Sequence, residues 1–546
     1  MRGLLGQDWV DGLADYHRPP GHYRVEVEAL LNVERLEGLY PVRARDPRMV
    51  WNYLLGIGPR ATARKILSRT RERFRNEKHL SCGVGRVVER PRRGRHELGA
   101  RVVFLWPAGP ACAERIVLPE ELLAAAEPDL SLPRPGDGVA YLSAQASSGS
   151  EIVWWRALRG WSPESGAMLP PLGVAVVLKD AARALAAADW TRARQLPYSG
   201  TRASTVLAPA RDPALARTGR PRAALFGYGN YAKTIALPGL AAHLAVDRIH
   251  ELDPTQIPLR RAPGVTWDTC PELPLEDLPD AVIVAGYHHT HAPLAAEALL
   301  RGAAVLVEKP VATTRPQLHR LLAAMRSSGA PLFSGYQRRY LPFNELARRD
   351  LGVAPGDPVS YHAVVFEVPL PPLHWYRWPV SRSRLLSNGC HWLDHFLYLN
   401  DWAAVSDHQL AVAPDGQLNC SVTLENGAFM TLVLTDHGSR RLGVRDHVEL
   451  RAGGVTVTIE DMSRYRSENA SRVLARRRIP RLETYRTMYD EIGRRIASGA
   501  PGDSLLSLQR SAGLVLDLEE QLSGPTTSRV QVTSWPLAAV RAVASA

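Results

Sequence analysis

The sequence predicts an α/β protein built on a doubly wound parallel sheet, with a mostly antiparallel α/β domain after it and a β-rich region before it. Between residues 220 and 335, short apolar runs alternate with helical stretches, which is typical of a parallel sheet covered by helices on both faces. Long alternating runs at 417–436 and 446–460 favour antiparallel strands near the C-terminus. Short strand-like runs separated by Gly and Pro fill residues 1–125.

The chain of 546 residues is too long for one hydrophobic core, so several domains are expected. Segments rich in Pro, Gly, Ser, Ala and Arg mark the connections. The predicted divisions are a β-rich domain over 1–150, a helical segment and linker over 151–219, a parallel-sheet domain over 220–335 and a C-terminal domain over 336–546.

Composition excludes several classes of protein. The net charge of +12 comes from basic residues spread along the chain, so no nucleic-acid partner is expected. The five cysteines lie far apart and form no Cys-x-x-Cys pair, which argues against disulfides and structural zinc. No apolar run reaches membrane-spanning length and the N-terminus lacks a secretory apolar region, so we expect a cytoplasmic protein.

Lysine is scarce: of 67 basic residues only five are Lys. Arginine therefore supplies the generic positive charge, and a retained lysine has a raised chance of needing chemistry that a guanidinium cannot perform, because arginine does not deprotonate. The five are Lys65, Lys78, Lys179, Lys233 and Lys309.

A glycine-rich turn follows the apolar run at 222–226 and has the spacing Gly-x-Gly-x-x-Ala. Such a turn between a strand and a helix binds a pyrophosphate, and an acidic residue about 20 positions later takes the ribose hydroxyls. The alternative is an ordinary glycine turn. An acidic residue favours NAD over NADP, although the nearby Arg248 and His250 leave NADP possible. The residues expected to hold the cofactor are Gly227, Gly229, Asn230, Tyr231, Ala232 and Glu251.

A polar loop with three histidines follows the next apolar run, 280–286. Ligands of a doubly wound sheet lie at the carboxyl ends of strands, so Tyr287, His288 and His291 are expected to border the cofactor. A metal site from the histidines is the alternative, but adjacent residues seldom converge on one ion, and no metal is predicted.

The segment Glu308-Lys309-Pro310 ends the following strand, and all three residues are expected to line the cofactor site. A lysine with a depressed pKa at that point could exchange a proton with a carbinol or carbonyl oxygen. The alternative is a surface lysine paired with Glu308. The scarcity of lysine favours Lys309 as the leading catalytic candidate.

A second candidate lies near 387–395, where His391, Asp394 and His395 share one face of a predicted helix. His391 could be a second acid/base group with Asp394 orienting it. As an isolated pattern this is more often a helix with a polar face.

These motifs, with Gly335-Tyr-Gln-Arg-Arg-Tyr340, resemble those of the Gfo/Idh/MocA oxidoreductases over residues 220–523. The resemblance implies a Rossmann domain followed by an open-faced α/β domain that carries substrate and oligomer contacts. It also implies acid/base or substrate-orienting roles for Lys309 and His391. The residues interpreted as substrate contacts are Gln337, Arg338, Arg339, His374, Trp375, Asn388, Asp394 and His395.

The N-terminal region resembles more weakly the GroES-like barrel of alcohol dehydrogenases, as in the bi-domain branch of the family. Gly21 to Ala29, Cys82 to Glu89 and Gly99 to Pro119 carry this likeness. The zinc-ligand pattern is absent and 150–215 holds no second dinucleotide turn. A docking, substrate-covering or oligomerisation role is expected.

The expected activity is reversible hydride transfer between NAD(P) and a carbinol or ketone of a sugar-like, nucleotide-sugar or cyclitol substrate, in a homo-oligomer formed through the C-terminal sheet. An imine substrate is an alternative. Ser387 and Asn388 stand where relatives often have an acidic residue. This departure would also suit a non-catalytic dinucleotide-binding sensor or scaffold.

Overall fold

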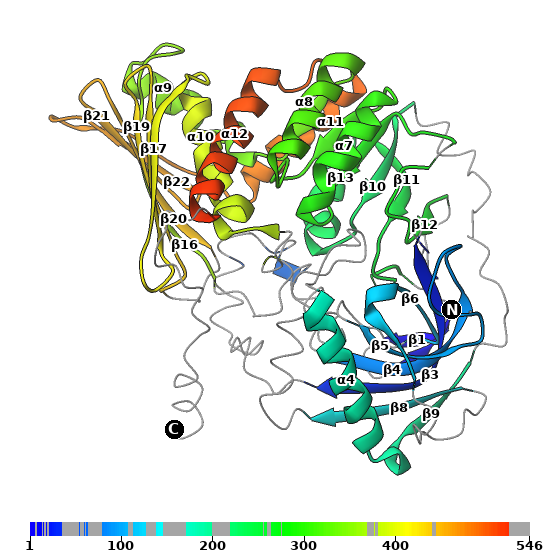
Figure 1. The fold of residues 1–546 in the computed structure, drawn as a ribbon. Coiled ribbons are helices and arrows are strands. Elements are labelled where there is room, and N and C mark those ends of the chain that lie inside the picture. The colour runs from blue at the N-terminus through cyan, green and yellow to red at the C-terminus, as the bar shows by residue number, and fades with distance from the viewer. Residues whose placement is uncertain are drawn as a thin grey trace. The chain divides into compact units, whose positions relative to one another are not determined.

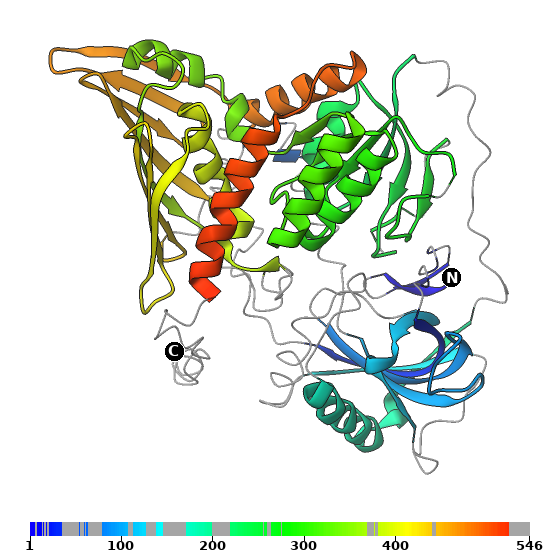
Figure 2. The ribbon, with the colours of Figure 1, turned by 45° about the horizontal axis from the view of Figure 1, so that its top comes forward.

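The computed structural model describes most of residues 1–34, 79–145, 171–198, 219–368, 381–438 and 444–523, together with Tyr376 and a few positions between 54 and 63. Two compact units divide these residues. The first comprises 1–335, 370–382 and 485–503, and the second comprises 336–369, 383–484 and 504–546. Figures 1 and 2 show the elements of both units in two views.

The N-terminal part of the first unit is a β-rich layer with one long helix. Its sheet has the order β7-β5-β4-β3-β8-β9, with β6 also paired to β3. Helix α4 (Pro171–Ala187) packs on β4 and β5, where it covers a core that includes Phe104 and Leu105. The strands are β1 (Gly3–Leu5), β2 (Asp8–Val10), β3 (His22–Glu34), β4 (His79–Glu89), β5 (Arg101–Trp106), β6 (Arg115–Pro119), β7 (Leu123–Ala125), β8 (Gly138–Gln145) and β9 (Arg194–Pro197).

The second sheet of this unit is entirely parallel. Its order is β12-β11-β10-β13-β14-β15, so successive strands run outward in both directions from β10. Its central strands are buried almost throughout, as expected when helices cover both faces. The strands are β10 (Arg222–Phe226), β11 (Ala245–His250), β12 (Thr266–Asp268), β13 (Ala281–Val284), β14 (Ala304–Val307) and β15 (Leu332–Ser334).

Helices follow each central strand, as a doubly wound sheet requires. A π-helical turn, η3 (Ala232–Ala236), leads into α6 (Leu237–Leu240) after β10. The short turn η4 (His288–Thr290) and α7 (His291–Leu300) follow β13. Helix α8 (Arg315–Ser328) begins where the Thr314 hydroxyl accepts from the Gln317 amide, and it lies beside α7 (Figure 1). Helix α11 (Glu483–Ala497) also joins this unit from Tyr485 onward.

The second unit is an eight-stranded, mostly antiparallel sheet with helices on one face. Its order is β17-β18-β19-β16-β20-β21-β22-β23, and only the β16–β19 pair is parallel. Alternate residues of β18 and β19 are buried, which gives the sheet one covered face. The strands are β16 (Ser360–Phe366), β17 (Val405–Val412), β18 (Leu418–Leu424), β19 (Phe429–Thr435), β20 (Arg445–Ala452), β21 (Val455–Glu460), β22 (Arg464–Glu468) and β23 (Val473–Arg478).

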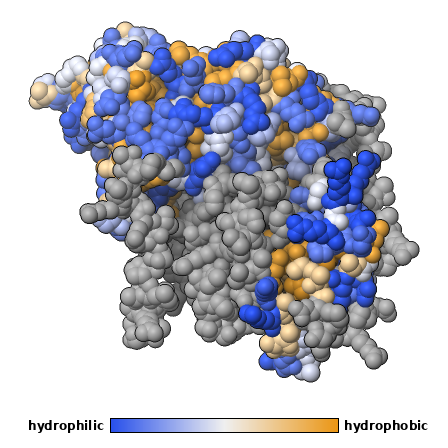
Figure 3. All heavy atoms as spheres, in the orientation of Figure 1, coloured by the Kyte–Doolittle hydropathy of each residue, from blue (hydrophilic) through white to orange (hydrophobic). Residues whose placement is uncertain are grey.

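The helices of this unit are η5 (Gln337–Tyr340), α9 (Asn344–Leu351), η8 (Leu385–Gly389), α10 (Cys390–Leu399) and α12 (Leu505–Ser523). Helices α10 and α12 pack together, and α12 also contacts β17 (Figures 1 and 2). On the face drawn in Figure 3, hydrophilic residues are interleaved with small apolar patches. Val364, Phe429 and Val473 are exposed apolar residues of this sheet.

The fold class predicted from the sequence is confirmed: a parallel Rossmann-like sheet precedes a mostly antiparallel one. The boundaries differ in detail, because β9 pairs with β8 and α4 packs on β5, which carries the N-terminal layer to Pro197, beyond the expected limit at 150. Segments 370–382 and 485–503 of the expected C-terminal domain join the first unit. Among the described helices, none combines the length and apolar character that crossing a membrane requires.

Candidate active site

The predicted cofactor residues gather at one edge of the parallel sheet. Gly227 follows β10, Glu251 follows β11, Tyr287 follows β13 and Glu308 follows β14. All four strands run in the same direction, so their carboxyl ends meet at this edge. The strand order reverses between β10 and β13, which is where open α/β sheets bind their ligands.

The glycine turn has the backbone that a pyrophosphate site needs. Gly227 has a φ of 93°, a left-handed conformation that favours glycine, and its amide donates to the His250 carbonyl at 2.9 Å. A Cβ on Gly229 would meet no atom within 4 Å, so its backbone borders open space. The helix starts directly afterwards at Asn230. Its unpaired N-terminal amides therefore lie next to the turn.

Asn230 adds a polar group at the same point. Its Oδ1 atom is buried and has no hydrogen-bond partner among the described residues. A buried polar atom without a partner costs free energy. Oδ1 is an acceptor, so a hydroxyl group of a bound dinucleotide could donate to it, and the residues present fit such a ligand.

Glu251 is hydrogen-bonded to the glycine turn. One carboxylate oxygen accepts from the Tyr228 amide at 2.6 Å and the other accepts from the Asp253 amide at 3.0 Å. Burial, followed by the charge of Asp253, raises the pKa of Glu251 to about 7. A carboxylate has about four acceptor sites, so two amide bonds leave capacity for ribose hydroxyls.

The two basic residues that left NADP open are paired within the unit. Arg248 lies 3.4 Å from a carboxylate oxygen of Asp277. His250 Nδ1 lies 2.6 Å from Asp268 Oδ1, and its ring stacks on Phe226. These pairings direct both side chains to carboxylates of the chain itself.

Two histidines after β13 are buried beside the lysine. His288 and His291 are each 1 % exposed. The ring nitrogens of His291 lie 2.9 Å from the Pro310 carbonyl and 3.1 Å from the Gly286 carbonyl, so this ring links the ends of β13 and β14. Burial, followed for His288 by the charge of Lys309, lowers the pKa of both rings, that of His291 to about 4. Both imidazoles are therefore neutral near pH 7.

Lys309 faces an aromatic residue that sequence reasoning missed. Its Nζ atom lies 5.6 Å from the centre of the Tyr376 ring, and that ring lies 4.8 Å from the ring of His288. A cation over a tyrosine face is stabilised electrostatically. His374 and Trp375, predicted as substrate contacts, lie outside the described residues. Their neighbour Tyr376 is the aromatic residue that meets Lys309.

Glu308 also has a partner that the sequence did not reveal. Its carboxylate accepts a hydrogen bond from the Tyr489 hydroxyl of α11, which itself lies 2.9 Å from the Tyr231 hydroxyl. Burial raises the pKa of Glu308 to about 7, against the lowering effects of the Tyr489 bond and of Lys309. Tyr231 thus has a side-chain role in addition to the backbone role predicted for it.

The second catalytic candidate, His391, lies in the other unit. It follows the π-helical turn η8 in the first turn of α10 and is 8 % exposed. Asn388, one turn earlier, donates to a Glu367 carboxylate oxygen at 2.6 Å. Arg384 lies near that carboxylate and 2.7 Å from Asp436. The polar groups around Asn388 are therefore bound to one another.

The predicted orienting residue Asp394 has a different set of partners. It is fully buried, and Arg339 binds its carboxylate through both Nε and Nη2, with the closest contact at 2.6 Å. The Ser511 hydroxyl of α12 donates to the same carboxylate. Tyr336 and Trp402 flank the guanidinium. Arg339 and Asp394 thus join η5, α10 and α12, and their role as substrate contacts stays a prediction.

Three further predicted substrate contacts are buried in the same unit. Arg338 is 2 % exposed, bonds to Asp446 and lies over the Trp392 ring. His395 is 0 % exposed, with its ring nitrogens near the Tyr361 hydroxyl and the Asn344 side chain at 3.1 and 3.0 Å. Gln337 is 4 % exposed. Arg338 and His395 tie elements of the unit together, because their polar atoms find partners inside it.

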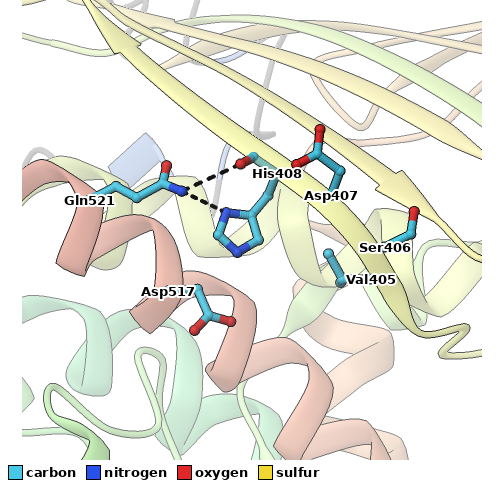
Figure 4. Close-up of a pocket in the computed structure, with 6 residues that line it drawn as sticks. All are labelled: Val405, Ser406, Asp407, His408, Asp517 and Gln521. Carbon is cyan, nitrogen blue, oxygen red and sulfur yellow. Dashed lines mark hydrogen bonds between the residues drawn. The ribbon is translucent and has the colours of Figure 1, made fainter.

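A shallow pocket elsewhere in the second unit holds none of the predicted residues. It lies between β17 and the end of α12, where Gln521 Nε2 is 2.9 Å from His408 Nδ1 (Figure 4). Its lining residues are Val405, Ser406, Asp407, His408, Asp517 and Gln521.

The parallel-sheet domain matches a known family. Residues 222–336 match the model described as "Oxidoreductase family, NAD-binding Rossmann fold". Over 87 residues the chain is 40% identical to "Inositol 2-dehydrogenase 1" of Saccharopolyspora erythraea, which is 16% of this chain and 26% of that protein. The chain thus spans about a quarter of that relative. The predicted NAD-binding Rossmann domain is confirmed over the matched residues.

Solved structures show similar chains at low identity. One is KijD10, a 3-ketoreductase from Actinomadura kijaniata in complex with NADP, at 21% identity and a TM-score of 0.45, covering 54% of this chain and 96% of that one. Another is a Gfo/Idh/MocA family oxidoreductase from Vibrio cholerae at 17% identity and 0.45, covering 56% and 98%. The GroES-like assignment of the N-terminal region stays a prediction.

Proposed function

We propose, from the premise that residues 222–336 belong to the Gfo/Idh/MocA oxidoreductases, that the chain catalyses reversible hydride transfer between NAD(H) and a carbinol or ketone. Lys309 is the group that exchanges the proton with the substrate oxygen. The substrate is a polar molecule of the sugar, nucleotide-sugar or cyclitol class.

One observation carries this proposal. Lys309 follows the strand β14 at the same sheet edge as the glycine turn, and its described neighbours include two buried histidines whose pKa values are lowered. Neutral imidazoles add no second positive charge beside the lysine. A lysine in such surroundings is suited to general acid and general base chemistry.

When bound, the dinucleotide would supply or accept the hydride. The amides of the Gly227 turn would hold its phosphates, and Asn230 Oδ1 and the Glu251 carboxylate would accept hydrogen bonds from its hydroxyl groups. Lys309 Nζ donates a proton to the oxygen of a ketone, or removes one from a carbinol in the reverse direction. Tyr376 limits where the ammonium can lie, because its ring packs 5.6 Å from Nζ.

His391 is proposed as the second substrate-binding residue. It stands at the start of α10, and its side chain retains 8 % exposure while Asp394 and His395 of the same helix are fully buried. Of the residues on this predicted face, His391 is therefore the one best suited to meet a substrate.

NAD is proposed as the preferred cofactor. Glu251 at the end of β11 carries negative charge above its pKa of about 7, which disfavours a 2′-phosphate. The guanidinium of Arg248, which could have offset that charge, pairs with Asp277.

The proposal also includes a homo-oligomer that assembles through the eight-stranded sheet. Val364 is 53% exposed and Phe429 39% exposed, and both belong to neighbouring central strands. Sedimentation of the wild type and of a Val364→Lys variant measures whether this face holds copies together.

The test is turnover of the purified full-length chain. NADH and NADPH are supplied with a panel of keto-sugars, nucleotide keto-sugars, keto-cyclitols and imines, and the oxidised cofactors with the corresponding alcohols. Lys309→Met removes the proton-exchanging group. Lys179→Met, an exposed lysine of α4, is the matched control.

Turnover that Lys309→Met abolishes and Lys179→Met preserves supports the proposal. Turnover of imines alone would show that the substrate is an imine and not a carbinol or ketone. Cofactor binding without Lys309-dependent turnover on any substrate would favour a dinucleotide-binding sensor, and absence of binding would overturn both functions.

A further inference from the structure

A chain of three hydroxyl and carboxyl groups lies behind the proposed catalytic lysine. Tyr231 stands at the start of the helix after the glycine turn, and Glu308 precedes Lys309. Tyr489 comes from α11, 181 positions after Glu308. The Tyr489 hydroxyl bonds to Glu308 Oε1 and lies 2.9 Å from the Tyr231 hydroxyl.

The direction of these bonds follows from counting protons. Tyr489 has one hydroxyl proton and two oxygen neighbours. An ionised carboxylate is a stronger acceptor than a phenol, so the proton goes to Glu308. Tyr231 can then donate its own proton to the Tyr489 oxygen. The two tyrosines form an ordered relay of donors that ends on the carboxylate.

Two glycines lie against this cluster, and a side chain at either position would collide with it. A Cβ on Gly335 would lie 2.6 Å from Glu308 Oε2, so the carboxylate lies directly against that backbone. A Cβ on Gly239 would lie 2.6 Å from the Cβ of Tyr489. Helix α11 therefore approaches the helix after the glycine turn closely enough to place its tyrosine beside Glu308.

We propose that Tyr489 is a positioning residue that holds the Glu308 carboxylate ionised and fixed beside Lys309, and so sets the proton affinity of the lysine. The inference rests on the proposed role of Lys309. Helix α11, although far from Lys309 in the sequence, would thus influence the proton transfer through Tyr489.

Several described groups face Lys309. They include His288 from η4, His291 from α7, Tyr376 and Glu308. Burial lowers the pKa of the two histidines, that of His291 to about 4, so neither ring changes charge near neutral pH. Burial raises the pKa of Glu308 to about 7, so this carboxyl does change charge there.

The groups that face Glu308 act in opposite directions on its charge. Burial favours the neutral acid, whereas the Tyr489 hydroxyl, the Lys309 charge and the Lys309 backbone amide favour the carboxylate. Removing the hydroxyl removes a bond to a charged acceptor. The midpoint of the Glu308 titration is then expected to rise by about one pH unit.

The scarcity of lysine allows a direct measurement. Reductive methylation with ¹³C-formaldehyde labels five lysines and the N-terminus, and Lys309→Arg identifies the Lys309 resonance. In the wild type this resonance should show an inflection near pH 7 from the charge of Glu308. In Tyr489→Phe the inflection should move up by about one unit, and in Glu308→Gln it should vanish.

Tyr485→Phe is the matched control. It removes a hydroxyl one helical turn earlier on α11, from a ring 6.1 Å from that of Tyr231, and leaves the Tyr489 bond to Glu308 in place. Its inflection should match the wild type. The double variant Tyr489→Phe with Glu308→Gln should behave like Glu308→Gln alone, because Tyr489 acts through Glu308.

An inflection that does not move in Tyr489→Phe, in a protein that keeps its wild-type melting temperature, would overturn the inference. So would an inflection that persists in Glu308→Gln. The readout requires no substrate, so it can fail while Lys309-dependent turnover stands. If Lys309→Met keeps full turnover, the proposed function fails whatever the resonance does.

Discussion

Polar side chains gather in two places, and they are used differently. At the carboxyl edge of the parallel sheet, buried histidines and a buried glutamate surround Lys309, whose ammonium faces the ring of Tyr376. Around α10, the acidic and basic groups neutralise one another: Arg339 binds Asp394 and Arg338 binds Asp446. The first place has shifted pKa values around a lysine. The second has closed ion pairs and one buried histidine, His395, whose pKa burial lowers.

The difference separates chemistry from architecture. An active site holds groups whose pKa values are perturbed and whose protons can move. A buried ion pair with added hydrogen bonds is strongly damaged when one partner is removed, because the other charge stays buried. Substitutions in the two places should therefore change different quantities.

The largest effect is expected for Lys309→Met. Turnover should fall by about 10² to 10⁴, the contribution typical of one acid/base group. The midpoint of denaturant unfolding should stay near that of the wild type. If the variant loses stability in proportion to its activity, Lys309 stabilises the fold and the loss of turnover does not show a catalytic role.

Arg339→Met should show the converse. The free energy of unfolding of the C-terminal sheet should fall by about 3–5 kcal/mol, because the Asp394 carboxylate remains buried with Ser511 as its described partner. Arg349→Met, at a side chain 70% exposed, is the control and should change stability by less than about 0.5 kcal/mol. Equal losses in the two variants would contradict the structural role.

Buried His291 at the sheet edge should make the stability of the fold depend on pH in the acid range. The folded-state pKa of His291 is lowered from 6.5 to about 4, so the unfolded chain binds a proton that the folded chain refuses. Stability should fall as the pH drops from about 6.5 to about 4, by up to about 3 kcal/mol from this ring. Chemical denaturation of wild type and His291→Gln across this range measures the difference. If the free energy of unfolding depends on pH in the same way in His291→Gln as in the wild type, other groups cause the loss of stability in acid.

The smallest effect concerns cofactor choice. Glu251→Gln keeps the size of the side chain and removes its charge above pH 7. The preference for NADH over NADPH should shrink by about tenfold, equivalent to about 1.4 kcal/mol. Fluorescence titration with both cofactors measures it, with Glu272→Gln as a control remote in sequence. A preference that grows would mean that Glu251 does not meet the ribose.

Local patterns predicted the parts of the site that lie within one βα unit. The strand, the glycine turn and Glu251 occur within 30 residues, and Lys309 stands out by the rarity of lysine. Contacts across long separations were invisible. Tyr489 reaches Glu308 from 181 positions away, and nothing in the sequence of α11 distinguishes this tyrosine from Tyr485.

The sequence also did not reveal the partners of Arg338 and Arg339, which were predicted as substrate contacts. Asp446 lies 108 positions from Arg338, and Asp394 lies 55 positions from Arg339. A charge pattern cannot show whether its partner is a ligand or another part of the chain. The fold itself was easier to predict, because apolar periodicity is a local property.

The most direct test of the account is a titration of the ¹³C-methylated protein with NADH. Lys309 follows β14, and Lys233 lies over the Tyr228 ring beside the glycine turn. Their resonances should both move and saturate together, while that of Lys179 in α4 stays still. Saturating NADH that leaves the Lys309 and Lys233 resonances unchanged would contradict a cofactor site at this edge of the sheet.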